Sequence, residues 1–293
     1  PDLWWSGPVE VKSLEKKGAA LLPGKSVVMV LCPVHFSQGR LREDESQVLR
    51  IQGQVVDTSK AMVEEGLVYF SHDMVDPSLD LKMPLRPKPN KIHSWLQVVD
   101  FRSGAPVLRD PVSIPGQLLN VSQADAQGAV LLTQTDLILK KDADAARVIQ
   151  ACAYDGVNAY LLDTYVTATS FQSAAAAEGD CLYLTQEKGK AGVVAVGYQK
   201  EAGRLGQISS WTTNAPPQLL HVTAGHLLAS SLGNLEVASI QSNTGKLSAI
   251  ASYDTPATLQ LKVDRSTVTP TLGLWIPAGR YGVEFLQKQA IEP

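Results

Sequence analysis

The sequence predicts an all-β fold built from repeated small sheets, and three observations support that prediction. The stretch 217–256 has four short apolar segments separated by three tight connections, as one antiparallel sheet has. Glycines that open a short apolar segment recur about every 50 residues, at Gly18, Gly66, Gly128, Gly179 and Gly225. Glycines typical of hairpin turns recur with a similar period, at Gly39, Gly104, Gly156, Gly203 and Gly245. Because two independent series share one period, the chain is expected to repeat a single sheet.

The stretch 217–256 defines the repeating unit. Side chains alternate between two faces over 235–240, as in a half-buried strand. Asn243-Thr244-Gly245-Lys246 is typical of a hairpin turn, because glycine tolerates the positive φ that tight turns need, and 247–253 is the expected returning strand. One such sheet cannot bury both of its faces, whereas copies stacked around an axis can. The sequence therefore predicts a β-propeller.

Six repeats account for most of the chain, which is expected to form one domain over residues 1–293. The predicted four-stranded blades span residues 8–52, 54–114, 117–168, 170–211, 217–253 and 257–287. One miscounted repeat would give five or seven blades instead of six. The last blade has no outer strand of its own. The segment 3–5 is similar to the outer-strand segments 208–211 and 250–253, so we expect it to complete that blade and close the ring.

Each complete blade is expected to hold four strands. In chain order the predicted strands are 8–16, 18–22, 26–36 and 45–52; 54–61, 66–71, 94–101 and 107–114; 117–123, 128–134, 147–154 and 157–168; 170–177, 179–185, 192–199 and 205–211; and, in the last blade, 257–264, 271–276 and 281–287. The segment 170–178 also suits a helix, because it contains four consecutive alanines. It occupies a first-strand position, where small side chains fit near a crowded axis, so a strand is favoured.

Composition and charge limit the expected partners. The 293 residues are 44% hydrophobic, enough for a large core, and the net charge of −3 gives no strongly basic surface. Nucleic acid and anionic membranes are therefore not expected as partners. No apolar run reaches the ~18 residues that cross a bilayer, so membrane insertion is not expected. Cys32, Cys152 and Cys181 are expected as buried hydrophobic residues, and a disulfide between two of them stays open.

Two sets of segments resemble known propeller families. Leu235-Glu236-Val237, followed by Asn243-Thr244-Gly245-Lys246-Leu247, resembles blades of WD40-like and quinoprotein-like β-propellers, and Gly225-His226 resembles the Gly-His pair of WD repeats. The segments 95–100 and 114–116 are similar to secreted bacterial propellers distantly related to WD repeats. The resemblance implies the architecture and favours a secreted or periplasmic location, with the compartment otherwise open. It implies no functional residue, because no repeat ends in Trp-Asp and quinoprotein tryptophan motifs are absent.

The second blade is the longest repeat because of an insertion between Ser71 and Ser94. In propellers this connection lies at the mouth of the central channel, and long loops on rigid scaffolds often carry function. Four prolines stiffen the insertion, and Arg86, Lys88 and Lys91 make it locally positive. We expect it to dock an acidic or extended partner through His72, Asp73, Arg86, Lys88, Lys91 and His93. The alternative, a solvated insertion without a function, stays open.

No catalytic, metal or cofactor site is predicted. Residue types that bind metals gather around the insertion, but their spacing matches no metal signature. They are His72, Asp73, Asp76, Asp80 and His93. The sequence has no Gly-x-Ser-x-Gly elbow, no glycine-rich phosphate loop and no cysteine in an electropositive setting. Four tryptophans are expected to pack between strands rather than to bind a ligand: Trp4, Trp5, Trp211 and Trp275.

The favoured function is a non-enzymatic scaffold that binds a protein or peptide through its loop-bearing face. The alternative is a propeller hydrolase or lyase that acts on carbohydrate, with acids contributed by separate blades; the candidates are Asp57, Asp163 and Asp264. Two such carboxyl groups would have to lie roughly 5–10 Å apart in the channel. A third option is a structural module of a larger assembly. The sequence does not define the oligomeric state.

Overall fold

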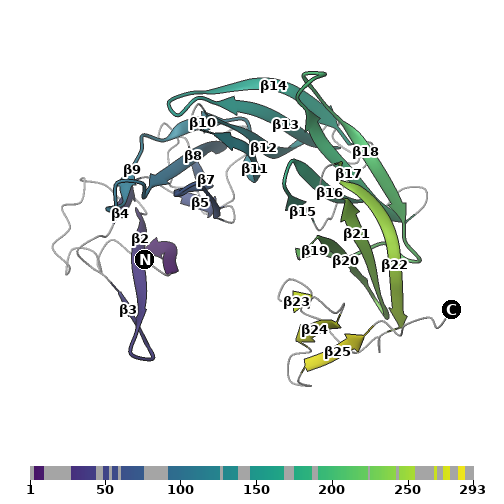
Figure 1. Ribbon diagram of the computed structural model, residues 1–293. Helices are drawn as coiled ribbons and strands as arrows, with labels where there is room; N and C mark the ends of the chain where they lie inside the picture. The colour runs from purple at the N-terminus through teal and green to yellow at the C-terminus, as the bar shows by residue number, and fades with distance from the viewer. Residues whose placement is uncertain are drawn as a thin grey trace, which may run out of the picture. The chain divides into compact units, whose positions relative to one another are not determined.

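The structure, a computed structural model, is all-β (Figure 1). It describes residues 3–9, 28–43, 49–52, 55–58, 61–75, 92–125, 128–137, 146–167, 175–186, 191–223, 225–241, 244–254, 267–268, 273–277 and 283–287. The strands in these ranges form six sheets, four of them four-stranded. The chain divides into two compact units: unit 1 comprises Pro1–Leu118, Ala124–Ala129 and Tyr154–Tyr160, and unit 2 comprises Leu119–Gln123, Val130–Ala153 and Leu161–Pro293. Within the described ranges, no helix is long and apolar enough to span a membrane.

The first sheet lies in unit 1. Its strands are β1 (Leu3–Val9), β2 (Val28–Ser37), β3 (Arg40–Glu43) and β4 (Leu49–Gln52). The strands β2 and β3 form a hairpin that closes at the pair Ser37↔Arg40. Both turn residues, Gln38 and Gly39, have positive φ, 53° and 75°, as a two-residue type I′ turn requires. The hairpin predicted at Gly39 is therefore confirmed, whereas the predicted strand 18–22 lies outside the described residues.

The position of β1 contradicts the predicted ring closure. Leu3–Val9 pairs antiparallel with β2, from Leu3↔Val34 to Val9↔Val28, instead of completing the last sheet. The last strand, β25, pairs only with β24 among the strands that the structure describes. A short apolar segment fits any open strand edge, and β2 offers an apolar edge that is much nearer along the chain. The similarity between 3–5 and the outer strands therefore did not indicate closure.

The second sheet, also in unit 1, has six short strands where the sequence predicts four. They are β5 (Val55–Thr58), β6 (Met62–Glu64), β7 (Leu67–Val75), β8 (Ile92–Asp100), β9 (Val107–Leu108) and β10 (Val112–Ile114). Both β5 and β6 pair with β7, and both β9 and β10 pair with β8. The predicted strand 54–61 corresponds to β5, and β6 begins after its end. The predicted strand 107–114 is interrupted once, between β9 and β10, because Pro111 lacks the N–H that a continuous ladder needs.

Three four-stranded sheets follow, each with its strands in chain order. They are β11 (Gln117–Asp125), β12 (Gly128–Leu137), β13 (Ala146–Tyr154) and β14 (Ala159–Val166); β15 (Ala175–Glu178), β16 (Cys181–Gln186), β17 (Gly192–Gln199) and β18 (Arg204–Thr212); and β19 (Leu219–Thr223), β20 (His226–Ser231), β21 (Asn234–Gln241) and β22 (Lys246–Asp254). The first of these sheets has residues in both units, and the other two lie in unit 2. These bounds closely match the predicted strands, and Ala175–Glu178 is a strand, as favoured.

The last sheet lies in unit 2 and has three described strands. They are β23 (Thr267–Val268), β24 (Gly273–Pro277) and β25 (Val283–Gln287). The strands β24 and β25 match the predicted strands 271–276 and 281–287. The predicted strand 257–264 lies outside the described residues.

The repeat is also visible in the backbone geometry. The five predicted hairpin glycines all have positive φ, between 63° and 94°. In the fourth and fifth sheets the outer strands β18 and β22 each carry a bulge, at Ile208 and Ile250. Each bulge lies five residues after the hairpin glycine, Gly203 or Gly245. A shared irregularity at the same position indicates that the two sheets are copies of one unit.

In unit 2 the sheets pack face to face. One cluster joins the third and fourth sheets and includes Ile149 and Leu182. Another cluster joins the fourth and fifth sheets and includes Tyr183, Trp211 and Leu227. Because neighbouring residues of a strand point to opposite faces, the fourth sheet is covered on both sides. The stacking that the repeat predicted is therefore present in unit 2, and Trp211 packs between strands as expected.

Candidate functional site

The candidate docking residues around the 71–94 insertion are only partly described. Three lie in strands and three lie outside the described residues: His72 and Asp73 in β7, His93 in β8, and Arg86, Lys88 and Lys91 in the undescribed part. In the strand register His72 pairs with Trp95 and His93 pairs with Met74, so the two histidine positions lie on adjacent strands without being partners. Docking through this insertion stays a prediction.

The side chain of His72 lies in the interior of unit 1. It is 1% exposed, and neither ring nitrogen has a hydrogen-bond partner among the described residues. The centroid of its ring lies 6.3 Å from that of Phe70. Burial lowers the pKa of His72 from 6.5 to about 4, so the imidazole is neutral at pH 7. A neutral, enclosed ring packs the interior, and we expect its burial to make the fold sensitive to acid.

One of the three carboxylates considered for carbohydrate chemistry has a described side chain. Asp163 Oδ2 accepts a hydrogen bond of 2.7 Å from the backbone N–H of Leu205, which ties β14 to β18. The side chains of Asp57 and Asp264 lie outside the described residues. Within that described part, no three His, Cys, Asp or Glu side chains are placed to share a metal ion. Asp163 therefore has a structural role in joining two sheets.

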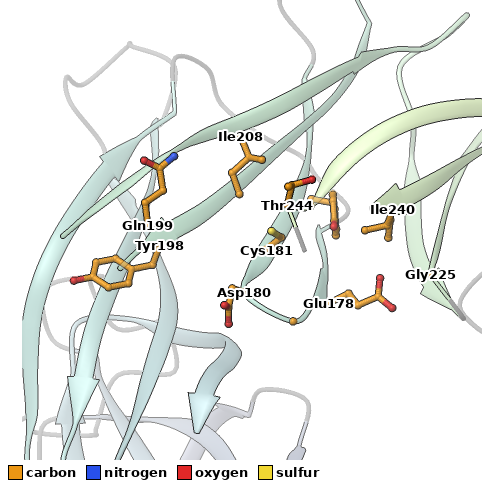
Figure 2. Close-up of a pocket in the computed structure, with 12 residues that line it drawn as sticks. Glu178, Asp180, Cys181, Tyr198, Gln199, Ile208, Gly225, Ile240 and Thr244 are labelled. Atoms are coloured by element: carbon orange, nitrogen blue, oxygen red, sulfur yellow. The ribbon is translucent and has the colours of Figure 1, made fainter. Parts of the chain in front are cut away.

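A pocket of about 540 Å³ lies within unit 2, between the fourth and fifth sheets (Figure 2). Its walls come from the β15–β16 turn, from the ends of β17 and β21, and from the β21–β22 hairpin. Figure 2 shows Glu178 and Asp180 along one edge, Ile208 and Ile240 on opposite sides, and Cys181 between them. Of the twelve described residues that line the pocket, two are acidic and none is basic.

The two acidic residues border a tight turn. Glu178 pairs with Cys181, so Gly179 and Asp180 form a two-residue connection between β15 and β16. Gly179 has a φ of 55°, which glycine adopts without strain. Asn120 Nδ2 donates a hydrogen bond of 2.6 Å to the carbonyl oxygen of Gly179, which anchors the turn to the third sheet. The anchored turn holds Glu178 half-buried and Asp180 exposed.

Two buried side chains of β16 form the inner part of the pocket. Cys181 and Tyr183 are 6% and 0% exposed, and both belong to the cluster that faces the fifth sheet. Burial, together with the charge of Asp180, raises the pKa of Cys181 to about 11, so this free cysteine is a thiol at neutral pH. Burial also raises the pKa of Tyr183. Its hydroxyl interacts with the thiol of Cys181 but has no hydrogen bond of normal geometry to any described residue.

The hairpin of the fifth sheet packs directly on Cys181. Gly245 is buried with a φ of 66°, and a side chain on its α-carbon would overlap the sulfur of Cys181. Ser209 Oγ of β18 accepts a hydrogen bond of 3.2 Å from the N–H of Leu247 and donates one of 3.5 Å to the carbonyl oxygen of Gly245. Glycine is therefore required here both by the turn and by the close approach of two sheets.

Sequence reasoning found the hairpin turn at Gly245 but missed the pocket itself, and it placed Gly179 at the start of a strand, whereas the structure places it in the β15–β16 turn. Gly179 and Gly245 were each recognised as repeat glycines, yet they are 66 residues apart and belong to different sheets. Only the stacking of the fourth sheet on the fifth brings them together. The available signal was the sequence Glu178-Gly179-Asp180, which places two acids beside one of the repeat glycines.

The outer strand β14 and the turn before it carry a second unusual feature, a run of exposed apolar residues. Of the nine large hydrophobic residues that are exposed in the described part of the chain, five lie between 157 and 166, with exposed fractions of 40–72%. They are Val157, Tyr160, Leu161, Leu162 and Val166. We call these five residues the β14 patch. The equivalent strands expose mostly polar residues: Arg204, Gln207, Ser210 and Thr212 on β18, and Lys246, Ser248, Ala249, Ser252 and Asp254 on β22.

Comparison with known proteins gives no family for this chain. No protein-family model and no curated protein matches the sequence, so the functional argument rests on the geometry described above.

Proposed function

We propose that the chain is a non-enzymatic β-propeller scaffold that binds a protein partner. The repeated four-stranded meanders, their face-to-face stacking in unit 2 and the recurring hairpin glycines support the propeller. One described sheet for each of the six sequence repeats supports a count of six blades.

The observation that carries the binding role is the contrast between β14 and its equivalents. Because the third, fourth and fifth sheets share one architecture, the fold itself does not explain why only β14 among these outer strands exposes large apolar side chains. Exposed apolar side chains on an outer strand favour association, and proteins usually avoid them unless a partner covers them. Burial of a leucine-sized side chain on a partner stabilises the complex by about 1.5–3 kcal/mol. Tyr160 supplies an aromatic anchor of the kind enriched in protein interfaces.

The insertion between Ser71 and Ser94 remains a second candidate contact, for an acidic or extended partner. Its positive charge is complementary to such a partner, whereas the β14 patch has no charged member. The two contacts therefore predict different salt dependence, because exposed charges are screened by salt and apolar contacts are not.

Site-specific photo-crosslinking tests the β14 patch. A photoreactive phenylalanine analogue replaces Tyr160 in one protein and Ser210, an exposed residue of β18, in a matched control. Each is irradiated in an extract of the source cells. We expect a discrete cross-linked product from position 160 that is absent from position 210. An excess of unlabelled wild-type chain should suppress it, whereas a chain carrying Leu161→Ser, Leu162→Ser and Val166→Ser should not.

Two results would overturn the proposal. One is the absence of a discrete product at position 160 when the chain is folded. The other is a product that forms equally at position 210, or that the triple-serine chain suppresses as well as wild type does.

A further inference from the structure

We propose that β14 binds an extended segment of another polypeptide as an additional strand, and that this segment is uncharged and carries apolar side chains on both of its faces. The binding edge is formed by residues 161–166. This inference deepens the proposed scaffold function, on which it rests, because it names the form and the chemistry of the partner.

The strand β14 is an edge of its sheet, which is the first requirement for strand addition. It pairs only with β13 among the strands that the structure describes. The backbone N–H and C=O groups on its outer side therefore point away from the sheet, and a further strand pairs with such groups. In an antiparallel ladder these outward groups come from alternate residues.

Both faces of β14 are uncovered where the strand is apolar. Leu161 and Leu162 are consecutive, and they are 61% and 40% exposed. Because neighbouring residues of a strand point to opposite faces, a partner that lies on one face of the sheet covers only one of the two leucines. A strand added at the edge places its own side chains beside both. The pattern is that of an interior strand that lacks a neighbour.

The exposed apolar surface is one strand wide, and this width selects a linear partner. On the adjacent strand β13, each of residues 148–152 is at most 6% exposed. The spacing of residues and strands makes the edge 161–166 a strip about 20 Å long and about 5 Å wide. A standard interface between two globular proteins covers about 800 Å² on each side, far more than this strip. One extended segment fits it, and backbone hydrogen bonds add to the small apolar contact.

Charge defines the chemistry of the segment. The single charged residue of β14, Asp163, is half-buried, and its Oδ2 accepts the hydrogen bond from the N–H of Leu205. The equivalent strands begin with an exposed basic residue, Arg204 on β18 and Lys246 on β22. Exposed charges of this kind protect an edge from pairing. The edge of β14 lacks such a charge, so an uncharged apolar segment is complementary to it.

The position of Asp163 also argues against a second copy of this chain as the added strand. Asp163 lies near the middle of β14, so antiparallel pairing of two β14 strands places the two Asp163 residues opposite or diagonal to each other. Like charges in such positions destabilise a sheet. The added segment therefore belongs to a different polypeptide.

Hydrogen exchange of the full-length chain, measured on amide NMR signals, tests strand addition. The probe is the blocked peptide Lys-Val-Thr-Val-Ile-Thr-Val-Lys. Its matched control has N-methyl groups on the two central residues, which removes a donor from each edge of the peptide and keeps every side chain. We expect the probe to bind with a Kd of about 0.5 mM and the control to bind about tenfold more weakly. At ten times Kd, alternate amides among 161–166 should exchange about tenfold more slowly, because exchange then occurs only from the free fraction.

Three variants assign the contacts. Leu161→Ser and Leu162→Ser should each weaken binding of the probe about three- to tenfold, because each removes an apolar neighbour on a different face. Both leucines are exposed in the free chain, so neither substitution opens a cavity. Gln207→Ser changes an exposed residue of the equivalent strand β18 and should leave binding unchanged. An effect of only one of the two leucines would mean docking on one face and would overturn strand addition.

Three further results would overturn the added strand. They are equal binding of the N-methylated peptide, unchanged exchange of alternate amides with the probe, and a chain that sediments as a dimer until Leu161→Ser or Leu162→Ser dissociates it. The first two mean that side chains alone make the contact, and the third identifies a second copy as the occupant. A discrete cross-link from position 160 alongside any of these results leaves the scaffold function intact. Absence of that cross-link overturns the scaffold function itself, whatever the peptide does.

Discussion

Gly203 and Gly245 occupy the same position in consecutive sheets, with φ of 63° and 66°, but their surroundings differ. A side chain at Gly203 meets nothing within 4 Å, whereas one at Gly245 would overlap the sulfur of Cys181. We expect Gly203→Ala to lower the free energy of unfolding by about 1 kcal/mol, from the left-handed backbone alone. Gly245→Ala should cost about 3 kcal/mol, because two sheets must also separate. Urea denaturation measures both values, and equal costs would contradict the close packing at Cys181.

His72 should make the stability of the fold depend on pH. Its pKa is about 4 in the folded chain and near 6.5 when exposed, so between these values the unfolded chain binds more protons. Stability should therefore be complete above pH 6.5 and fall towards pH 4, by about 3 kcal/mol in total. His72→Phe places another ring beside Phe70 and should remove this dependence. Urea midpoints at pH 7, 5.5 and 4.5 test this prediction. If the midpoint of the variant falls with pH as steeply as that of the wild type, the acid response belongs to other groups.

Adjacent sheets of unit 2 are joined by the same device twice. A side chain of one outer strand accepts a hydrogen bond from the N–H of a leucine in the next sheet: Asp163 from Leu205, at 2.7 Å, and Ser209 from Leu247, at 3.2 Å. Both leucines come two residues after the hairpin glycine, and both are buried. Each hairpin segment thus contains the turn glycine, a buried leucine and the hydrogen bond to the preceding sheet within three residues.

Removal of these acceptors should destabilise unit 2. We expect Ser209→Ala to lower the free energy of unfolding by about 1 kcal/mol and Asp163→Ala by about 2 kcal/mol, since the second bond has a charged acceptor. Asp163→Asn keeps an acceptor oxygen and should recover part of the loss. Because the links lie at different interfaces, the double alanine variant should show nearly additive costs in urea denaturation. Full stability of Asp163→Ala would instead leave this carboxylate available for another role.

The strands between residues 117 and 253 were predictable because three features of the sequence indicate the same strand bounds there. These features are the positions of the glycines, the alternation of polar and apolar residues, and the lengths of the apolar segments. The pairing of β1 was not, because Leu3-Trp4-Trp5 suits any open edge and local sequence does not specify which edge it meets. The β14 patch was missed because its apolar residues have the composition of a buried strand. The buried position of His72 was missed because it follows the apolar strand segment at the very border of the insertion.

At the scale of the whole molecule, the third sheet is the element that both compact units contain. Strands β11, β12, β13 and β14 each have residues in unit 1 and in unit 2. Neither unit can unfold completely without breaking strands of this sheet. A single domain over 1–293, which stays a prediction, therefore has a specific physical consequence: the two units should lose their structure together.

Fluorine NMR of the chain labelled with 5-fluorotryptophan tests this cooperativity. Trp95 lies in unit 1 and Trp211 is buried in unit 2, so their signals report on the two units separately. We expect both native signals to disappear at one urea midpoint. Leu132→Ala, which empties a fully buried site of the third sheet, should lower both midpoints together, by a destabilisation of about 2–5 kcal/mol. A lower midpoint for Trp211 alone would mean that unit 1 folds independently and that the chain behaves as two domains. The reason is that a cavity in one domain does not lower the stability of a neighbouring domain that unfolds separately.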